Sequence, residues 1–572
     1  MRLPSSQALC GLQRRATAAT RLPTLRGPAA VCRAFALSSS FSSSSSFSSS
    51  TPSQDSSASK SPPAPPPPSP QSQAPQAIID AKYIRENAQL YSENCTRRNY
   101  GAMAGYPGRM VELFDQWKAS QIDTRTLREE ANTVRKQITN APAARDEAKD
   151  ASSAPNDNPS RESLLERARV LKQQLATVKA DETRLNSEIQ QLAAALPNLT
   201  SAETPDGEQD VLSYFNCDGE GPGGKPTNES GTDYYTSASL MQTPDLWRSH
   251  VQIGAELGLM DFSAASAASG WGWYYLLGDG ARLEQALVQY ALNVVHRHGW
   301  QLVSPPSIVR SGIAAACGFQ PRDQGGEQQT YSLEGLPLSL TATAEIPLAA
   351  LYADTTIEAT TAPETGDLKG LPVRRAAVSR CYRAEAGARG ANTKGLYRVH
   401  EFTKVELFAW TEPDLDITTE MFDELVDIQT EILSSLGLPC RVLEMPATDL
   451  GASAFRKIDI EAFFPGRCRP KGNQSTDAAG NSPADYDYAT GWGEVSSASI
   501  CTDYQSRRLA TRAKINGGPL TFPWTLNGTA LAVPRVLAAI LENGWDEEAK
   551  SVTIPECLQP WMDGQETIEA KQ

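Results

Sequence analysis

Apolar residues recur in alternating steps of three and four along two stretches of the chain. In the first stretch, residues 110–138, the repeat comprises Met110, Leu113, Trp117, Leu127, Ala131, Val134 and Ile138, with Ser120 and Thr124 as weaker members. In the second stretch, residues 164–196, the repeat comprises Leu164, Ala168, Leu171, Leu175, Val178, Leu185, Ile189, Leu192 and Leu196. Only Glu182 interrupts the second repeat. This sustained spacing predicts two long helices that pair through a coiled-coil seam.

The segment between these helices, "APAARDEAKDASSAPNDNPS", cannot be helical throughout because of its prolines and short polar residues. The simplest arrangement is an antiparallel helical hairpin, with helices that each reach roughly 40–50 Å. Two interpretations are open: a coiled coil for dimerisation, or an arm that touches a large partner. Basic residues on the outside would suit a polyanion, although charges there are usually only solvated; they are Arg161, Arg167, Arg169, Lys172, Lys179 and Arg184.

Beyond residue 230 the pattern changes to mixed helix and strand. "ARLEQALVQYALNVVHRHG" predicts an amphipathic helix, and the strand-like "WQLVSPPSIV" follows it. "RVHEFTKVELFAW" alternates as a strand does. "NGTALAVPRVLAAILENG" predicts a turn at the end of a strand and then a helix that Gly544 closes. Residues 218–232 and 469–490 are rich in Gly, Ser, Asn and Asp and predict irregular insertions.

The stretch 380–408, "RCYRAEAGARGANTKGLYRVHEFTKVELF", places charges inside apolar runs, which is costly in a core unless the charges are paired or bound. We interpret it as two antiparallel strands, 374–387 and 396–410, joined by the loop "ARGANTKG". Alternation then puts Arg383 and Glu385 on one face. One side of the second strand carries Arg398, His400, Phe402, Lys404 and Glu406. Arginine can grip a phosphate and an aromatic ring can stack on a base, so this face predicts the floor of a pocket for a nucleotide and an amino acid.

Three further segments carry polar residues of the same kind. "TATAEIPLA" puts Glu345 two residues after a threonine, on the same face if the segment is extended. "GWGEVSSASICTDYQSRR" brings Glu494 close to Ser496 and Ser497, and carboxylate plus hydroxyl suits Mg²⁺ that bridges phosphates. "LNGTALAVPRVLAAILEN" puts Arg535 at the opening of a helix, where the side chain and the helix dipole favour an anion.

The length, net charge and cysteine and histidine content of the chain limit the classes of function that it can have. The 572 residues suffice for two or three domains with a large core. The formal net charge is −14, so a nucleic-acid partner would need a local basic surface on an acidic body. The ten cysteines form no CxxC pair, which predicts free thiols in a reducing compartment. Four scattered histidines make a zinc site unexpected, and no apolar run approaches the roughly 20 residues that span a membrane.

The N-terminus is rich in arginine and serine and has no acidic residue before Asp55. This composition is typical of organelle transit peptides, whereas a secretory signal would need a continuous apolar run. We expect mitochondrial import, with a merely disordered tail as the alternative. The serine tract 38–50 and "SPPAPPPPSP" cannot bury enough apolar area to fold, so they predict a linker or a removed leader.

Taken in order, these segments resemble the class II aminoacyl-tRNA synthetases, and among them the seryl-tRNA synthetases. "TAE" is similar to that family's serine-binding motif, "YRAEAGARGANTKGLYRVHEFTKVE" to motif 2, "GEVSSASICTDYQSRR" to its Glu-x-Ser-Ser segment and "NGTALAVPR" to motif 3. "GWQLVSPPSIV" resembles motif 1, the dimer-interface motif, and "IIDAKYIRENAQLYSENCTRRN" with the hairpin matches the N-terminal arm. The resemblance extends from about residue 77 to the C-terminus, and five co-linear motifs make it specific.

The resemblance implies roles for particular residues. Arg383 would hold the α-phosphate of ATP and Arg535 the γ-phosphate, while Glu494 and Ser497 would ligate Mg²⁺ through ATP. The catalytic set is Arg383, Glu494 and Arg535. The ATP-binding set is Arg383, Ala384, Glu385, Val399, Glu494, Val495, Ser496, Ser497 and Arg535, with Glu385 and Val399 lining the adenine site. The serine-binding set is Thr343, Ala344, Glu345, Arg383, Glu406 and Thr529.

The implied reaction has two steps. The serine carboxylate attacks the α-phosphate of ATP, and the terminal ribose hydroxyl of tRNA(Ser) then takes the seryl group. No enzyme nucleophile is needed, so catalysis rests on positioning and charge stabilisation. One alternative is a non-catalytic synthetase-like protein, which the presence of Arg383, Glu494 and Arg535 argues against. Another is an enzyme for a different amino acid such as threonine, which the long hairpin and the lack of zinc-type ligands argue against.

The chain departs from the family pattern at a few positions. Glu401 stands where the family commonly has Gln, and Thr529 and Pro534 stand where bacterial members tend to have Ser and Gly. In the "SSASIC" segment, Ala498 and Ile500 replace a frequent cysteine and asparagine. Thr529 keeps a hydroxyl, so recognition of serine is still expected.

The resemblance also implies the organisation of the whole chain. The expected fold is α+β: an antiparallel mixed sheet flanked by helices, with an N-terminal antiparallel helical-hairpin arm. Residues 1–76 would be a transit peptide and disordered Ser/Pro-rich linker, 77–200 the tRNA-binding arm and 201–572 the catalytic domain. The expected partners are L-serine, ATP with Mg²⁺, tRNA(Ser) and a second copy of the chain in a homodimer, with neither membrane nor DNA. The expected location is the mitochondrial matrix.

Overall fold

The structure is a computed structural model that describes residues 75–140, 160–217, 248–319, 329–364, 368–385, 395–470 and 486–570. All of these residues belong to one compact unit, residues 67–572. The predicted transit peptide and linker lie almost entirely outside the described residues. So do the tip of the predicted hairpin, the insertion at 218–232, most of the insertion at 469–490 and the loop between residues 385 and 395.

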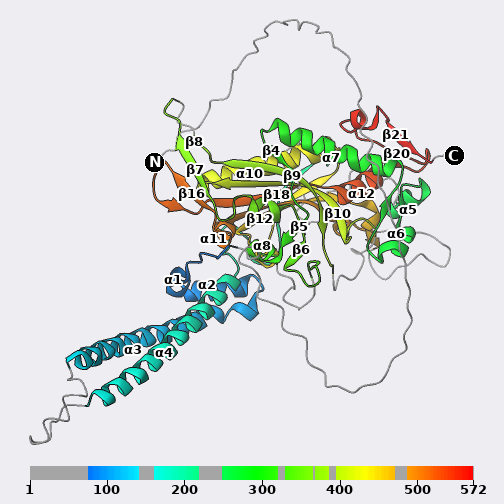
Figure 1. The fold of residues 1–572 in the computed structure, drawn as a ribbon. Helices are drawn as coiled ribbons and strands as arrows, with labels where there is room; N and C mark the ends of the chain where they lie inside the picture. Colours follow the sequence, from blue (N-terminus) through cyan, green and yellow to red (C-terminus); the bar gives the residue numbers. More distant parts are fainter. Residues whose placement is uncertain are drawn as a thin grey trace, which may run out of the picture. The chain divides into compact units, whose positions relative to one another are not determined.

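The two predicted long helices form and pack along each other (Figure 1). They are α3 (Tyr106–Asn140) and α4 (Arg161–Ala195), each of 35 residues and slightly longer than the apolar repeats indicated. The Ser160 side chain caps the start of α4 by accepting a hydrogen bond from the Ser163 backbone N–H. Two short helices precede the hairpin, α1 (Ala81–Glu86) and α2 (Ala88–Arg97).

The apolar seam of the hairpin is divided into two clusters. Near the base, Ile84 of α1 and Cys95 of α2 pack with the seam residues Met110, Leu113, Leu185, Ile189, Ala193 and Leu196. Farther along, the buried residues are Val134, Leu164 and Leu171. Between the clusters, the buried Thr124 hydroxyl donates a hydrogen bond to the carboxylate of Glu182. Two of the three polar positions in the predicted repeats therefore face each other and form a hydrogen bond.

The central sheet has eight strands among the described residues, in the order β1-β11-β12-β15-β18-β10-β9-β4. Every neighbouring pair is antiparallel except β4 and β9, which confirms the predicted antiparallel mixed sheet. The strands are β1 (Asp210–Phe215), β4 (Gln301–Val303), β9 (Val373–Tyr382), β10 (Glu401–Thr411), β11 (Cys440–Glu444), β12 (Arg456–Phe463), β15 (Trp492–Thr502) and β18 (Trp524–Ala532).

Helices flank this sheet, as predicted (Figure 1). The helices of this part of the chain are α5 (His250–Glu256), α6 (Phe262–Ser269), α7 (Asp279–Arg297), α8 (Ser311–Ala316), α9 (Glu345–Ala349), α10 (Leu415–Ser435), α11 (Tyr504–Arg508) and α12 (Val533–Asn543). The predicted amphipathic helix at 281–299 is α7. The predicted closure by Gly544 is confirmed, since this glycine caps α12, but "NGTALA" continues strand β18 and is not a turn.

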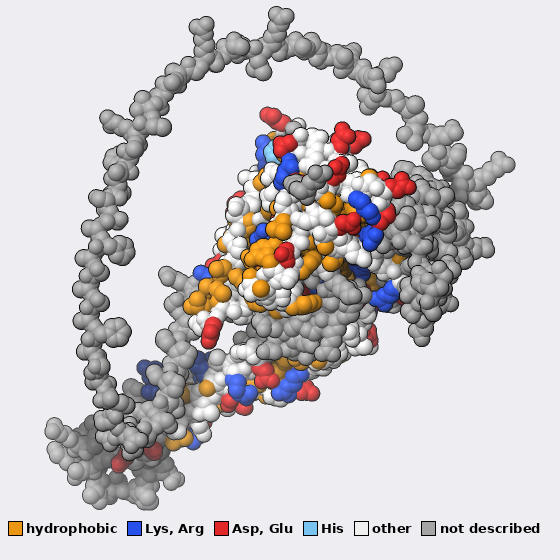
Figure 2. All heavy atoms as spheres, turned by 90° about the vertical axis from the view of Figure 1, so that its right-hand side faces the viewer, with side chains coloured by type: hydrophobic (Ala, Val, Ile, Leu, Met, Phe, Trp, Pro, Cys, Tyr) orange, Lys and Arg blue, Asp and Glu red, His pale blue; other side chains and the backbone are white. Residues whose placement is uncertain are grey.

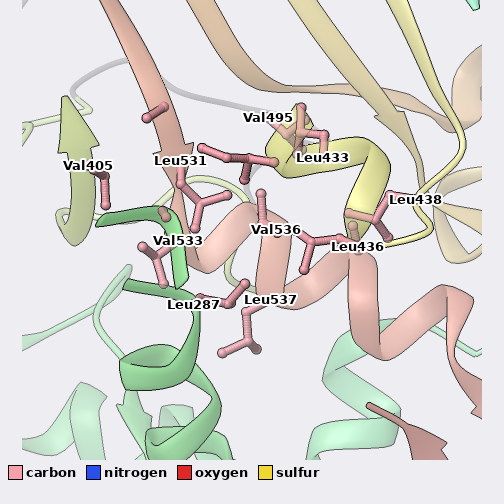
Figure 3. Packing of buried hydrophobic residues seen from close by; sticks show 14 of the residues in the cluster. Leu287, Val405, Leu433, Leu436, Leu438, Val495, Leu531, Val533, Val536 and Leu537 are labelled. Carbon is pink, nitrogen blue, oxygen red and sulfur yellow. The ribbon is translucent and has the colours of Figure 1, made fainter. Parts of the chain in front are cut away.

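Alternate side chains of β10 enter two different cores. Val405, Leu407 and Ala409 pack with α7, α10 and α12 in the larger core. Figure 3 shows part of this core, where Leu287 of α7, Leu433 of α10 and Val536 of α12 lie with residues of the sheet. Phe408 and Trp410 point the other way, into a second core that includes α8 and α9. By alternation, Phe402, Lys404 and Glu406 lie on the side of the second core.

The remaining strands are short. They are β2 (Met260–Asp261), β3 (Tyr275–Leu276), β5 (Ile308–Arg310), β6 (Leu338–Leu340), β7 (Thr356–Thr361), β8 (Leu368–Lys369), β13 (Arg469–Pro470), β14 (Tyr486–Asp487), β16 (Arg512–Ile515), β17 (Leu520–Thr521), β19 (Trp545–Asp546), β20 (Ser551–Thr553) and β21 (Thr567–Glu569). The eight cysteines of the described ranges are free thiols, as predicted. In these ranges no helix combines the length and the apolar character that crossing a bilayer requires.

Candidate active site

A cavity of about 510 Å³ lies where β12, β15, β18 and β10 are consecutive neighbours in the sheet. It is also bordered by the first turn of α12 and by the segment before α9. Most of the residues singled out from the sequence line it: Thr343, Glu345, Arg383, Glu385, Val399, Glu494, Val495, Ser496, Ser497, Thr529 and Arg535. Four do not line it, namely Ala344, Ala384, His400 and Glu406. The cavity therefore gathers segments that are far apart in the sequence.

Glu494 and Arg535, which both line the cavity, contact each other. Nη1 of Arg535 lies 3.3 Å from Oε2 of Glu494 and donates to the Glu494 carbonyl at 3.0 Å. Nε of Arg535 donates to the Tyr397 carbonyl at 3.0 Å, which holds the side chain in place. Burial raises the pKa of Glu494, but Arg535, Lys457 and Arg383 outweigh burial and lower that pKa to about 2. Glu494 is therefore ionised at neutral pH, between three cations.

Arg383 lies just beyond the end of β9. Its backbone N–H donates to the His400 carbonyl at 2.9 Å, and its guanidinium carbon lies 5.2 Å from the centre of the Phe402 ring. The next residue, Ala384, donates its backbone N–H to the Gln329 carbonyl at 3.0 Å. Glu385 has a φ of +48°, a value that residues other than glycine rarely adopt, and its carboxylate lies 3.5 Å from Arg398.

The predicted strands 374–387 and 396–410 are too long. β9 ends at Tyr382 and β10 begins at Glu401, and three residues after β9 the backbone turns at Glu385, where φ is positive. Arg383, Glu385, Arg398 and Val399 consequently border the cavity from segments beside the sheet, not from its floor.

His400 was also predicted on the pocket floor, and this is wrong. Its ring lies among Trp271, Trp273 and Tyr331, and its Nδ1 is 2.9 Å from the Tyr331 hydroxyl. His400 is thus part of an aromatic cluster beside the cavity.

Glu345, the first residue of α9, lines the cavity and is buried. Its Oε1 accepts a hydrogen bond from Nε2 of Gln505 at 2.6 Å. Burial, together with the charge of Glu406, raises the pKa of Glu345 to about 8. The segment is not extended, the condition under which Thr343 and Glu345 would share a strand face, because α9 begins at Glu345; the Thr343 hydroxyl accepts from the Glu345 backbone N–H at 3.3 Å.

Glu406 lies beside the cavity without lining it. Its side chain is fully buried, and Nζ of Lys404 lies 2.6 Å from its Oε2. Asn527 and Thr529, which do line the cavity, donate to this carboxylate at 3.3 Å and 3.4 Å. The register that places Glu406 of β10 opposite Thr529 of β18 brings these groups together. Glu406 is therefore linked to the cavity indirectly, through Asn527 and Thr529.

The Glu-x-Ser-Ser segment lies on β15. The Ser496 hydroxyl donates to the Thr529 carbonyl, while the Ser497 carbonyl accepts from Gln429 at 2.8 Å. Glu494 and Ser497 both line the cavity, so an ionised carboxylate and a hydroxyl are available to a hard cation. The described residues contain no cluster of three or more His, Cys, Asp or Glu that could hold a metal by itself. A cation here would need further ligands from a bound phosphate or from water.

Sequence reasoning missed Lys457 and Asp459 of β12. Lys457 lines the cavity, and its Nζ lies 2.6 Å from Oδ2 of Asp459. Burial raises the pKa of Asp459 to about 7, with a further contribution from the charge of Glu494. The signal was present in "RKIDIEAF", where charged and apolar residues alternate along one strand.

Two family models match this chain. One, "tRNA synthetase class II core domain (G, H, P, S and T)", matches residues 334–544, and the other, "Seryl-tRNA synthetase N-terminal domain", matches residues 78–200. The mitochondrial serine–tRNA ligase of Saccharomyces cerevisiae is 46% identical over 322 residues, which cover 56% of this chain and 65% of that relative. The mitochondrial serine–tRNA ligase of Schizosaccharomyces pombe is 36% identical over 505 residues, 87% of this chain and 90% of that relative.

A solved structure agrees with these matches. Seryl-tRNA synthetase from Pyrococcus horikoshii, complexed with ATP, has a TM-score of 0.67 and 26% identity, covering 86% of this chain and 100% of that one. The sheet, the cavity and the match over 334–544 define a class II aminoacyl-tRNA synthetase. The N-terminal match and the full-length relatives narrow the class. The chain belongs to the seryl-tRNA synthetase family, the serine–tRNA ligases, which join serine to tRNA at the expense of ATP.

Proposed function

We propose that the cavity binds ATP and L-serine side by side, joins them as seryl-adenylate, and then passes the seryl group to tRNA(Ser). One observation carries this proposal. A single cavity is lined by Arg383, Arg535 and the ionised Glu494, and also by Glu345 and Thr529. Cations suit the phosphates of a nucleotide, while carboxylates and hydroxyls suit the ammonium and hydroxyl groups of serine.

We assign the charge stabilisation to two arginines. Arg383 would hold the α-phosphate while its phosphorus becomes five-coordinate, and Arg535 would hold the γ-phosphate as pyrophosphate leaves. Both side chains are oriented before the substrate binds, Arg535 by two backbone carbonyls and Arg383 beside the Phe402 ring. Groups that are already oriented stabilise developing charge without a reorganisation cost. Glu385 and Val399 would line the adenine, with Ala384, Val495 and Ser496 completing the ATP site.

The residues proposed to bind serine would select it from other amino acids by hydrogen bonding. Thr343, Ala344, Glu345, Glu406 and Thr529 would surround the amino acid, with Arg383 at its carboxylate. One carboxylate would meet the ammonium and another the hydroxyl. A site built to bond a hydroxyl strongly rejects a ligand that lacks it, so glycine and alanine would be excluded in this way and threonine by its size.

Glu494 and Ser497 would supply two ligands to Mg²⁺, and phosphate oxygens and water would complete its coordination. When bound, Mg²⁺ supplies charge neutralisation on the phosphates. Glu494 would remain deprotonated throughout the neutral pH range, since its pKa is about 2.

The helical arm would bind tRNA(Ser), as an antiparallel hairpin of two 35-residue helices offers a long surface to a large polyanion. In this proposal, residues 77–200 form the tRNA-binding arm and residues 201–572 form the catalytic domain. Several outward arginines of the hairpin pair with carboxylates, for example Arg167 with Glu130 and Arg169 with Glu166. Phosphates would have to displace such exposed pairs, which costs little.

A homodimer would form through the edge of the sheet at β4. Leu302 of β4 is 44% exposed and Ile308 of β5 is 49% exposed. Ile308 also lines an adjoining hollow of about 640 Å³ together with Pro306 and Leu351. Exposed apolar side chains around a hollow are typical of a protein interface.

We place the enzyme in the mitochondrial matrix, with residues 1–76 as a transit peptide and linker. The arginine-bearing, acid-poor N-terminus supports this location, and so does similarity to relatives named as mitochondrial in two yeasts. Sequencing the N-terminus of protein recovered from the mitochondrial fraction would test it; a chain that still began at Met1 in the cytosol would contradict it.

ATP–pyrophosphate exchange, measured with each of the twenty amino acids, tests the central proposal. Exchange should require serine, and neither alanine nor glycine should replace it. A chain that folds yet exchanges with no amino acid would be a non-catalytic member of its family, and exchange driven by threonine would mean that the serine site is wrongly assigned.

A further inference from the structure

Four consecutive backbone carbonyls beside the cavity are held by two residues of the N-terminal region. Arg98 donates through its guanidinium to the carbonyls of Leu450 and Gly451. The Asn198 backbone N–H donates to the Ala452 carbonyl at 2.8 Å. Nδ2 of Asn198 donates to the Ser453 carbonyl at 2.9 Å. The segment Leu450–Ser453 is thus held along its whole length from outside the catalytic sheet.

The opposite side of this segment faces the substrates. Asp449, Gly451, Ser453 and Ala454 all line the 510 Å³ cavity, so residues 449–454 form one of its walls. We call these residues the 449–454 wall. Nδ2 of Asn198 also donates to the Cys501 carbonyl at 2.9 Å, at the end of β15, so the same amide ties the wall to the strand that carries Glu494 and Ser497.

The two anchoring residues are themselves fixed. Arg98 follows the last residue of α2 and its side chain is fully buried. Asn198 lies three residues after the end of α4, and its own carbonyl accepts hydrogen bonds from both Asn94 and Arg98. Residues from both ends of the hairpin region therefore meet at one point and hold the wall from there.

Arg98 has no ion-pair partner among the described residues. Its acceptors there are carbonyls, and burial lowers the pKa of the guanidinium. Keeping a cation buried without a carboxylate is unfavourable unless hydrogen bonds compensate for its lost hydration. The carbonyls of Leu450 and Gly451 in the wall, together with the Asn198 carbonyl, are these compensating groups, so the position of the wall and the position of Arg98 are mutually dependent.

We propose that Arg98 and Asn198 are positioning residues of the active site, which fix the 449–454 wall and thereby set the affinity of the cavity for ATP and serine. This inference rests on the proposed function of the cavity. It assigns to the base of the arm a part in adenylate formation, separate from the binding of tRNA by the hairpin.

The test uses the full chain and measures ATP–pyrophosphate exchange, with the active sites counted from the burst of adenylate formation. In Arg98→Gln and Asn198→Ala the KM values for serine and ATP should rise by about tenfold, because misplacement of binding groups by about 1 Å can cost up to roughly 10²-fold. The kcat per active site should change much less. Arg98→Lys keeps a buried cation that can donate to a carbonyl, so its KM values should lie between those of the wild type and Arg98→Gln.

Arg508→Lys is the matched control. Arg508 is also a buried arginine, and it donates to the carbonyls of Ala194 and Leu196 at 3.1 Å without touching the wall. This variant should melt at a lower temperature than the wild type while its KM values stay normal. The comparison separates loss of stability from loss of positioning.

Failure of the positioning role and failure of the proposed function would give different results. If Arg98→Gln and Asn198→Ala retain wild-type KM values and only lower the melting temperature or the number of active sites, the positioning role is refuted. It is also refuted if Arg508→Lys raises KM as much as they do. If the wild-type chain shows no serine-dependent exchange, the proposed function of the cavity fails instead.

Discussion

At the scale of single residues, the unusual feature of the site is that charged side chains lie on a strand that also builds the core. Along β10, Lys404 and Glu406 precede Phe408 and Trp410 on the same face. Both charges are buried, and their 2.6 Å pairing offsets part of the desolvation that each would otherwise suffer. Along this face of β10, the charged pair ends at Glu406 and the hydrophobic core begins two residues later, at Phe408.

Arg383→Ala should reduce kcat of ATP–pyrophosphate exchange by about 10²–10³, the usual effect of losing one oriented contact to the transition state. The fold should survive, since the Arg383 backbone keeps its hydrogen bond with His400. Arg380→Ala is the control: Arg380 lies three residues earlier, is exposed, and faces Glu284 and Glu401 outside the cavity. A normal kcat in folded Arg383→Ala would show that this arginine is only structural.

Glu345 should make folding stability depend on pH. Its pKa is raised from 4.5 to about 8 by burial, so the folded chain keeps a proton that the unfolded chain releases. Stability therefore falls as pH rises from about 4.5 towards 8. Glu345→Gln has no proton to lose at this position, so its melting temperature should fall less over that range. Melting curves at pH 5 and pH 8 check this, and equal pH dependence in both proteins would contradict it.

At the scale of elements, the hairpin is built as a base and a distal part. The base cluster packs α3 and α4 against α1 and α2, whereas the distal cluster holds only α3 and α4 together. Deleting the whole repeat region 110–196 would remove Met110, Leu113 and Ile189 and would therefore expose Ile84 and Cys95. A clean test of the arm must keep the base.

Replacing residues 124–182 with a short glycine linker removes the distal part and the Thr124–Glu182 pair together. ATP–pyrophosphate exchange should stay close to that of the full chain, because Arg98, Asn198 and the base cluster remain. Charging of tRNA(Ser) should be lost, and the affinity of the full chain for tRNA should fall as salt rises. Normal charging by the shortened chain would mean that the distal hairpin is only structural.

The sequence predicted the elements with a regular apolar period far better than the details of the cavity. The seam of α3 and α4 and the amphipathic α7 follow from side-chain spacing alone. The turn at Glu385 does not, because its positive φ belongs to a residue with no such preference. Lys457 and Asp459 could have been recognised from the alternation of "RKIDIEAF", whereas their neighbour Glu494 on β15 becomes recognisable only once the strand order is known.

At the scale of the whole molecule, the two edges of the central sheet offer different surfaces for assembly. On the face seen in Figure 2, acidic and basic side chains are interspersed, so neither sign of charge covers that face. The two ends of the central sheet are β1 and β4, and each presents one exposed leucine, Leu212 and Leu302, both 44% exposed. Only Leu302 lies next to the proline-containing segment that resembles the dimer motif.

Leu302→Lys combined with Ile308→Lys should produce a monomer in sedimentation and abolish exchange activity. A lysine buried in an apolar interface is strongly unfavourable, whereas the same lysine on a solvated surface is tolerated. Leu212→Lys, at the opposite edge with the same exposure, should leave association and activity unchanged. A double variant that stays dimeric would place the interface elsewhere, and an active monomer would show that dimerisation is dispensable.

The Thr124–Glu182 pair also limits how the hairpin can tolerate insertions. Thr124 faces Glu182 in the antiparallel pair, so a slip of one heptad would set Thr124 against Leu175 or Ile189 and Glu182 against Trp117 or Ala131. Leaving such a polar group without a partner costs about 1–3 kcal/mol, which corresponds to roughly five- to 150-fold in population. Seven residues added to one helix alone, between this pair and the base cluster, would force that slip. The same seven residues added to both helices would preserve the pair, so the length of this part can change only when both helices change together.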